Sequence, residues 1–186
     1  MIGIVIQARM GSSRCPGKSL AKLKGIPLLQ WLIQQLSTIA NIDKLIVATT
    51  TKPEDDSIFQ LCKSLNIDVF RGSENDVLSR YYHCSLQYEL STIVRITGDC
   101  PFIAPDTISE VLKYYKSASF SYVSNTLSYT RPEGQDVEIF DFKRLKDAYL
   151  HATSVLDREH VTPYIKRNTG DAVNYAHSIS PAKNLR

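Results

Sequence analysis

The sequence predicts a single three-layer α/β domain, residues 1–186, with a mostly parallel sheet. Short β-favouring runs alternate with segments whose apolar residues recur at helical spacing, which is typical of βαβ units. The 186 residues are 43% hydrophobic and 22% charged, as in an ordinary soluble globular domain. A domain of this size buries about 70% of the surface that its unfolded chain exposes, so its core needs no disulfide or metal.

Four strand–helix units are expected in the first two thirds of the chain. A long loop, Gln7 to about Gly25, separates the first strand from the first helix and is rich in Gly, Ser and basic residues. Right-handed crossovers would place helices on both faces of the sheet. The expected strands are 2–6, 45–49, 67–70 and 92–97, and the expected helices are 27–41, 54–65, 76–88 and 105–115.

The alternation changes after Asn125. Residues 129–135 contain Pro and Gly and predict a long loop. The segments that follow are a strand at 136–140, helices at 142–151 and 155–167, and a last strand at 172–176, with a further strand at 122–124 before the loop.

Positive charge is concentrated at the N-terminal end. Residues 1–42 contain no acidic residue and five basic ones, namely Arg9, Arg14, Lys18, Lys22 and Lys24. Such a field suits a polyanionic ligand, and a solvated basic loop is the alternative. The net charge of +3 and the pI of 8.6 are too small to indicate nucleic-acid binding.

The four cysteines show no metal-binding or paired spacing, so we expect free thiols. No signal peptide is visible, and no run approaches the roughly 18 apolar residues of a membrane span. We therefore expect a cytoplasmic protein that does not enter a membrane.

Ligands of open parallel sheets bind beyond the carboxyl ends of the strands. The loop after the first strand combines small residues with three cations, Arg9, Arg14 and Lys18. Exposed backbone N–H groups and cations suit an oligophosphate. The loop is not a Walker A motif, because Ser12 stands where that motif needs glycine six places before Lys18. An ordinary long connection is the alternative.

Several blocks resemble, in the same order, those of the cytidylyltransferase family that includes CMP-sugar-acid synthetases and spore coat polysaccharide biosynthesis proteins. The most specific block is IVIQARMGSSRCPGKSL, whose usual family form is close to QARMGS[ST]RLPGK. The chain departs from it at Cys15, where leucine is usual. The other blocks are VATTTKPEDD, VFRGSENDVLSRYY, VRITGDCP, YVSNT, GQDVEIF and DREHVTPYI.

The resemblance implies a Rossmann-like nucleotidyltransferase fold and a function in surface polysaccharide biosynthesis. In the implied reaction, the anomeric hydroxyl of a sugar acid attacks the α-phosphorus of CTP and gives a CMP-sugar and pyrophosphate. Arg14, Lys18 and Asp99 are the implied catalytic residues. The implied nucleotide-binding residues include Ala8, and Arg9, which would lie near the α-phosphate or the base. The others are Gly11, Ser12, Ser13, Arg14 and Lys18, around the β- and γ-phosphates.

Asp99 follows a hydrophobic strand and is the implied ligand of Mg²⁺, the expected cofactor, which prefers such oxygens. A turn-capping role is the alternative. Many relatives have a second acidic block resembling V-D-x-P-E-D, and none occurs before Arg186. The chain would then lack a C-terminal segment, or would have lost the metal site. Asp136 and Glu138, two places apart on one strand, could substitute, or could face a sugar hydroxyl or solvent.

The loop after the third strand supplies Arg71, the expected contact for the base, whose guanidinium suits the acceptors of cytosine. A structural ion pair with Glu74 or Asp76 is the alternative for Arg71. Asp76 also stands where a helix N-cap is expected.

The block Asp157-Arg158-Glu159-His160 resembles the region with which relatives bind the sugar or close the site. Arg158 could pair with the sugar carboxylate, and His160 could assist deprotonation of the hydroxyl. The resemblance also implies a homodimer, although no pattern of apolar residues in the sequence identifies its interface. Two rival functions stay open: a nucleotidyltransferase that uses another nucleotide, and a nucleotide-binding protein without catalysis.

Overall fold

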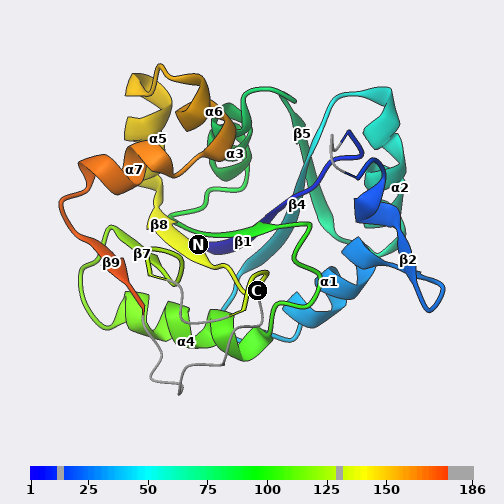
Figure 1. Cartoon of the computed structure of the whole chain (residues 1–186), viewed down its shortest axis with the longest axis horizontal. Helices are drawn as coiled ribbons and strands as arrows, with labels where there is room; N and C mark the ends of the chain where they lie inside the picture. The colour runs from blue at the N-terminus through cyan, green and yellow to red at the C-terminus, as the bar shows by residue number, and fades with distance from the viewer. Residues whose placement is uncertain (12–14, 129–131, 176–186) are drawn as a thin grey trace.

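The computed structural model describes residues 1–11, 15–128 and 132–175 and confirms the three-layer α/β architecture (Figure 1). Its strands are β1 (Ile2–Gln7), β2 (Lys22–Leu23), β3 (Ile26–Pro27), β4 (Lys44–Thr50), β5 (Asp68–Gly72), β6 (Thr92–Thr97), β7 (Tyr122–Ser124), β8 (Glu138–Asp141) and β9 (Ala172–Asn174). Its α-helices are α1 (Leu28–Leu36), α2 (Asp56–Ser64), α3 (Val77–Gln87), α4 (Pro105–Lys116), α5 (Phe142–His151), α6 (Val155–His160) and α7 (Pro163–Asn168).

The main sheet, within the described residues, has the strand order β5-β4-β1-β6-β8-β7-β9. Its neighbours pair in parallel except at β8, which is antiparallel to both β6 and β7. Consequently β8 begins at the edge of the sheet where β1 and β6 end. The prediction of a mostly parallel sheet is confirmed.

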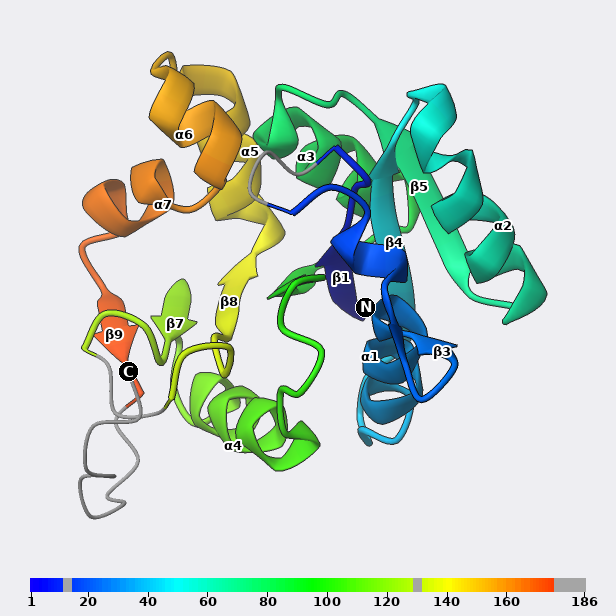
Figure 2. The ribbon, with the colours of Figure 1, turned by 45° about the vertical axis from the view of Figure 1, so that its right-hand side comes forward.

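Helices cover both faces of the sheet (Figure 2). Between the helices and the sheet lies an apolar layer on each face. Ile4 and Ile6 of β1 pack on the side of α1, α2 and α4. Val5, between them, packs on the side of α3 and α5, together with Tyr81 and Phe140. This alternation follows from the pleat, which directs successive side chains to opposite faces. Fully buried strands of this kind account for the continuous β-favouring runs in the sequence.

Gly98, directly after β6, lies against the end of β1. Its N–H donates to the carbonyl of Gln7 at 2.8 Å. A Cβ atom at this position would stand 2.9 Å from the same carbonyl oxygen. Only glycine therefore allows the chain to pass this close to β1 before it reaches Asp99.

The structure corrects several expected elements. The strand expected at 136–140 is β8, Glu138–Asp141, so Asp136 precedes the strand and does not share it with Glu138. Helix α1 ends at Leu36 rather than near residue 41, and the loop before it contains a 3₁₀ turn, Lys18–Leu20, and the small β2–β3 hairpin. The helix expected at 155–167 is two helices, α6 and α7. Val161 separates them with φ 69° and ψ −55°, and the N–H of Thr162 donates to the carbonyl of His160 at 2.8 Å. This is a γ-turn of the strained, positive-φ kind.

Candidate active site

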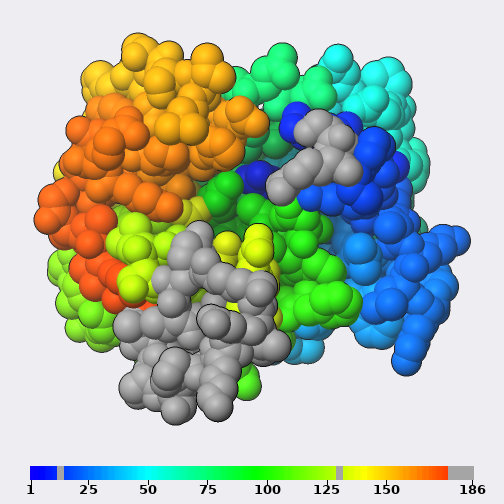
Figure 3. Space-filling model, in the orientation of Figure 1, coloured from blue at the N-terminus to red at the C-terminus, as the bar shows by residue number. Residues whose placement is uncertain are grey.

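A cleft of about 670 Å³ lies beyond the carboxyl ends of β1 and β6. The N-terminal segment and the α6–α7 segment stand on opposite sides of this hollow (Figure 3). Five of the residues predicted from the sequence line it, which are Ala8, Arg9, Asp99, Asp136 and His160. Open α/β sheets bind ligands at this edge.

The first loop is anchored to the sheet by its own backbone. The N–H of Met10 donates to the Asp55 carboxylate at 2.6 Å, and Asp55 is buried and also accepts from the Thr50 hydroxyl. The hydroxyl of Ser19 donates to the carbonyl of Arg9 at 3.2 Å. These contacts hold Arg9 and Met10 in place before Gly11, and join Arg9 to Ser19. Ser12, Ser13 and Arg14 lie outside the described residues.

Lys18 does not line the cleft itself, but it contacts Asp99, which does. The Lys18 ammonium lies 2.8 Å from the Asp99 carboxylate, and both side chains are partly exposed. Burial acts to raise the pKa of Asp99, but hydrogen bonds from Lys18 and Thr97 outweigh it and lower that pKa below its usual value. Asp99 is therefore an anion at neutral pH. The structure thus joins two predicted catalytic residues, which are 81 positions apart in the chain.

Arg9 lies near a second acidic group. Its guanidinium is 3.8 Å from the Glu74 carboxylate, and the Lys52 ammonium is 3.4 Å from the same carboxylate. Two cations thus share one anion on this side of the cleft. An oligophosphate could replace that anion as their partner.

Arg80 lines the cleft and was missed by the sequence analysis. It lies on the buried side of α3, where burial lowers its pKa. One guanidinium nitrogen donates to the carbonyl of Ser73 at 3.0 Å, while its Nε has no partner. A cation within an apolar helical stripe is the signal that could have identified it.

Arg71 does not line the cleft. Its Nε donates to the carbonyl of Thr50 at 2.8 Å and one terminal nitrogen donates to that of Lys52 at 3.0 Å. The other terminal nitrogen is 2.7 Å from the Asp56 carboxylate. The guanidinium therefore ties β5 to the end of β4, and we no longer assign Arg71 to the base. The ion-pair alternative applies, with Asp56 as the partner rather than Glu74 or Asp76.

The Arg158 guanidinium also forms hydrogen bonds within the protein. It donates to the carbonyls of Ala152 and Tyr149, each at 2.9 Å, and to the Asp76 carboxylate at 3.3 Å. Asp76 caps α3 by accepting from the N–H of Ser79, as predicted. Arg158 does not line the cleft, so we withdraw its assignment to a sugar carboxylate.

A smaller pocket of about 220 Å³ adjoins the cleft. Arg95, Thr97, Asp136 and His160 line both. The structure therefore brings the predicted residues Asp136 and His160 together beside a second chamber. The remaining lining of this chamber comes from Thr126, Glu138, Thr162, Pro163 and Lys166.

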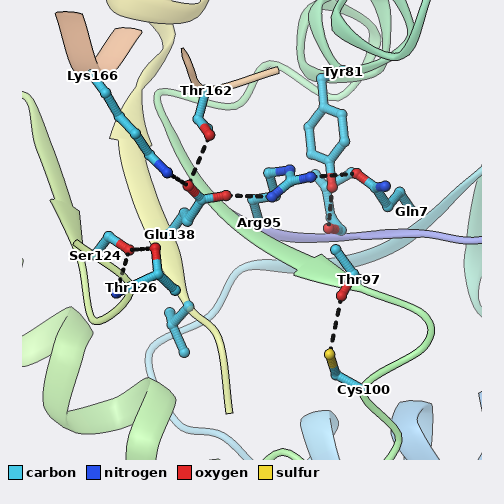
Figure 4. A network of polar contacts seen from close by, with 12 residues as sticks. Gln7, Tyr81, Arg95, Thr97, Cys100, Ser124, Thr126, Glu138, Thr162 and Lys166 are labelled. Carbon is cyan, nitrogen blue, oxygen red and sulfur yellow. Dashed lines mark hydrogen bonds and ion pairs between the residues drawn. The ribbon is translucent and has the colours of Figure 1, made fainter. Parts of the chain in front are cut away.

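Glu138 is engaged by the protein itself (Figure 4). Its carboxylate pairs with the Arg95 guanidinium and accepts from Tyr122 at 2.6 Å, Thr162 at 2.8 Å and Lys166 at 2.8 Å. Burial acts to raise the pKa of Glu138, but Arg95 and Lys166 outweigh it and lower that pKa to about 2. With four donors on its oxygens, Glu138 organises the pocket, and we withdraw it as a direct sugar or metal ligand.

A metal site would have to use few protein ligands. No group of three or more His, Cys, Asp or Glu side chains in the described part of the chain is arranged to hold a metal ion. Mg²⁺ commonly takes one or two carboxylates together with phosphate oxygens and water. Asp99 and Asp136, which both line the cleft, fit that pattern.

Comparison with known proteins assigns nearly the whole chain to one family. The family model described as cytidylyltransferase matches residues 3–181. The chain belongs to the cytidylyltransferase family. This is a family of nucleotidyltransferases that use CTP.

Two curated relatives match most of this cytidylyltransferase. An uncharacterized protein of Methanocaldococcus jannaschii is 44% identical over 90% of the chain and 68% of its own length. The spore coat polysaccharide biosynthesis protein SpsF of Bacillus subtilis is 33% identical over 88% of the chain and 69% of its own length. The chain thus spans about two thirds of each relative.

Solved structures agree with this assignment. A cytidylyltransferase from Leptospira borgpetersenii superposes with a TM-score of 0.89 at 31% identity, over 95% of this chain and 76% of that one. A CMP:2-keto-3-deoxy-manno-octonic acid synthetase complexed with CTP shares the fold, with a TM-score of 0.73 at 17% identity. In the described residues, no helix is long and apolar enough to cross a bilayer.

Proposed function

We propose that this cytidylyltransferase activates a sugar acid with CTP, releasing pyrophosphate and a CMP-sugar for surface polysaccharide assembly. The observation that carries the proposal is the Lys18–Asp99 pair at the rim of a cleft that continues into a second polar pocket. The cleft has the size of a small-ligand site. A two-chamber site suits a reaction that joins a nucleotide to a second substrate.

The nucleotide half of the site is proposed to be the first loop and the start of α3. Arg9 and Lys18 would neutralise the phosphates, and the resemblance adds Arg14. Arg80 replaces Arg71 as our candidate contact for the base, because Arg80 lines the cleft and Arg71 does not. Transfer of this kind depends mainly on positioning and charge neutralisation.

Asp99 is the proposed ligand of Mg²⁺, with Asp136 as a second candidate. The fit rests on an ionised carboxylate at the cleft rim and on the modest number of protein ligands that Mg²⁺ needs. When bound, the ion would neutralise charge on the nucleotide phosphates. In the structure, the Asp99 carboxylate is paired with the Lys18 ammonium.

The acceptor half of the site is proposed to be the smaller pocket. Arg95, Lys166 and three threonines give it hydrogen-bond donors suited to a hydroxylated, anionic sugar. A sugar hydroxyl oxygen would form a bond to the α-phosphorus while the bond to the β-phosphate oxygen breaks. His160, at the junction of the two chambers, is our candidate acceptor for the hydroxyl proton.

Isothermal titration tests the nucleotide half. We expect CTP to bind with Mg²⁺ and ATP, GTP and UTP to bind weakly. Arg14→Ala and Lys18→Met should weaken CTP binding, and Asp99→Asn should remove its Mg²⁺ dependence. Equal binding of another nucleotide would contradict the choice of CTP.

Pyrophosphate release tests the reaction. Wild-type protein, CTP and Mg²⁺ should release pyrophosphate only when a sugar acid of the right class is added. A panel of 2-keto-3-deoxy sugar acids is the first set to screen, because a relative of this fold acts on one. Tight CTP binding without release across a wide panel would favour the nucleotide-binding protein without catalysis.

A further inference from the structure

Three polar side chains form a row across three adjacent strands at the cleft edge. Arg95 of β6 pairs in register with Glu138 of β8, and Gln7 of β1 pairs with Thr97, two places further along β6. Gln7 and Arg95 are on the face covered by α3, because Val5 and Ile93, two places earlier in each strand, pack there. Figure 4 shows Arg95 between Gln7 and Glu138.

The row fixes the orientation of the Gln7 amide. A terminal nitrogen of Arg95 donates to Oε1 of Gln7 at 3.1 Å. A guanidinium carries donors only, so the atom of Gln7 that faces it must be the oxygen. The amide nitrogen, with its two N–H groups, is then left for a partner elsewhere. Gln7 is half-buried and lines the cleft.

Arg95 itself has little freedom. Its side chain is 13% exposed, and its ion-pair partner Glu138 is 6% exposed. The guanidinium also lies over the ring of Tyr81, 5.9 Å from the ring centroid, and Tyr81 is tied to the carbonyl of Val5. A donor held in this way meets a ligand without first having to be ordered.

We propose that Gln7 is a further binding residue, whose amide nitrogen donates to a phosphate oxygen of the nucleotide, and that Arg95 is the positioning residue that turns this nitrogen toward the cleft. The inference rests on the proposed use of CTP. Gln7 immediately precedes Ala8 and Arg9 and lies beside Thr97, two places before Asp99. The substrate atoms nearest to it are therefore those of the phosphates.

Gln7→Glu separates this role from a structural one. Glutamate keeps an oxygen for Arg95 and loses the donor toward the cleft, so the Tm should stay at the wild-type value or rise. The dissociation constant for CTP should increase at least about tenfold, as expected for loss of a hydrogen bond to a charged group. Gln60→Glu, an exposed change of the same kind on α2, is the matched control.

Gln7→Met separates loss of the donor from charge repulsion. It should weaken CTP and CMP binding about three- to tenfold and leave cytidine binding unchanged. If Gln7→Met binds CTP like wild type, the inference is wrong, whatever Gln7→Glu does. If all three ligands weaken equally, the partner is the nucleoside and not a phosphate. If wild-type protein does not bind CTP, the proposed function itself fails, and the inference fails with it.

Arg95→Lys tests the positioning role. Lysine can still pair with Glu138 but lacks the planar fork that reaches two partners at once. Arg95→Lys should weaken CTP binding as much as Gln7→Met does, and the double variant should bind no more weakly than either. Additive losses would show that Arg95 does not act through Gln7.

Discussion

Lys18 and Asp99 neutralise each other at the rim of the cleft in which we propose that CTP binds. Lys18→Met should therefore raise the pKa of Asp99 toward its ordinary value, since the lysine is a main cause of the lowered pKa. The same change should weaken CTP binding about ten- to a hundredfold, because it removes a charged donor. Titration of the Asp99 carboxyl by NMR and calorimetry with CTP measure the two effects.

Lys44 supplies the matched control for Lys18. It forms a partly exposed ion pair with Asp68, at 3.0 Å, and neither residue lines the cleft. Lys44→Met should leave CTP affinity and the Asp99 pKa unchanged. Equal losses in the two variants would mean that general charge, and not the Lys18 contact, attracts the nucleotide.

Glu138 is a buried carboxylate that forms ion pairs with Arg95 and Lys166. Glu138→Gln should lower the free energy of unfolding by about 3 to 5 kcal/mol at pH 7, because it leaves Arg95 and Lys166 without their anion. The folded-state pKa is lowered to about 2. The stabilisation is therefore fully present above the unfolded pKa of about 4.3 and is lost as the pH falls toward 2.

Urea unfolding of wild type and Glu138→Gln across a pH series measures this dependence. The difference between the two proteins should be constant above about pH 5 and should shrink at lower pH. A difference that stays the same down to pH 3 would contradict the assignment of the charge to Glu138.

At the scale of single elements, Asp76 connects the start of α3 to α6. It caps α3 through the N–H of Ser79 and pairs with Arg158 at 3.3 Å. Asp76→Ala should lower the free energy of unfolding by about 1 kcal/mol or more, whereas Asp76→Asn should cost less, because asparagine still caps. Asp141→Ala, which removes the cap of α5 alone, provides the comparison in urea unfolding. An equal loss in Asp76→Ala and Asp76→Asn would assign the effect to the ion pair.

The order of the elements could be predicted because apolar residues recur at a different spacing in helices than in buried strands. It did not predict the break between α6 and α7. Val161 stands at an apolar position that fits one continuous helix, and a β-branched residue rarely adopts positive φ. Two tertiary contacts accompany the turn: the side chain of Val161 is fully buried, and the Thr162 hydroxyl donates to Glu138. Neither contact can be read from the local sequence.

The site was predictable where a strand end delivers the residue. Asp99 and Arg9 each come two residues after the end of a strand, β6 and β1, and the sheet edge alone places them in the cleft. Arg71 and Arg158 stand in equally suggestive positions, but their donors meet carbonyls of other segments, which no local pattern reveals. Arg80 was not predicted, because it lies among the apolar residues of a helix at a position that is typical of the core.

At the scale of the whole molecule, the cleft joins segments from both ends of the described chain, so nucleotide binding should stabilise the entire fold. Free CTP at about 100 times its dissociation constant should raise the free energy of unfolding by about 2.7 kcal/mol. For a chain of this length the Tm should rise by roughly 5 to 11 °C. Thermal unfolding with CTP checks this, with GTP at the same concentration as control. An equal rise with GTP would contradict base selection.

The antiparallel direction of β8 has a consequence for how such an enzyme could change its substrate during evolution. β8 starts at the edge of the sheet where the cleft lies. Thr126, before the loop that leads into β8, and Asp136, after it, therefore both line the smaller pocket. The loop that we propose binds the phosphates follows β1, on the far side of β6. Glu133 and Gly134, shortly before β8, line the larger cleft. Insertions between residues 126 and 136 could therefore reshape the acceptor chamber and the adjoining part of the cleft, while the loop after β1 is inherited unchanged.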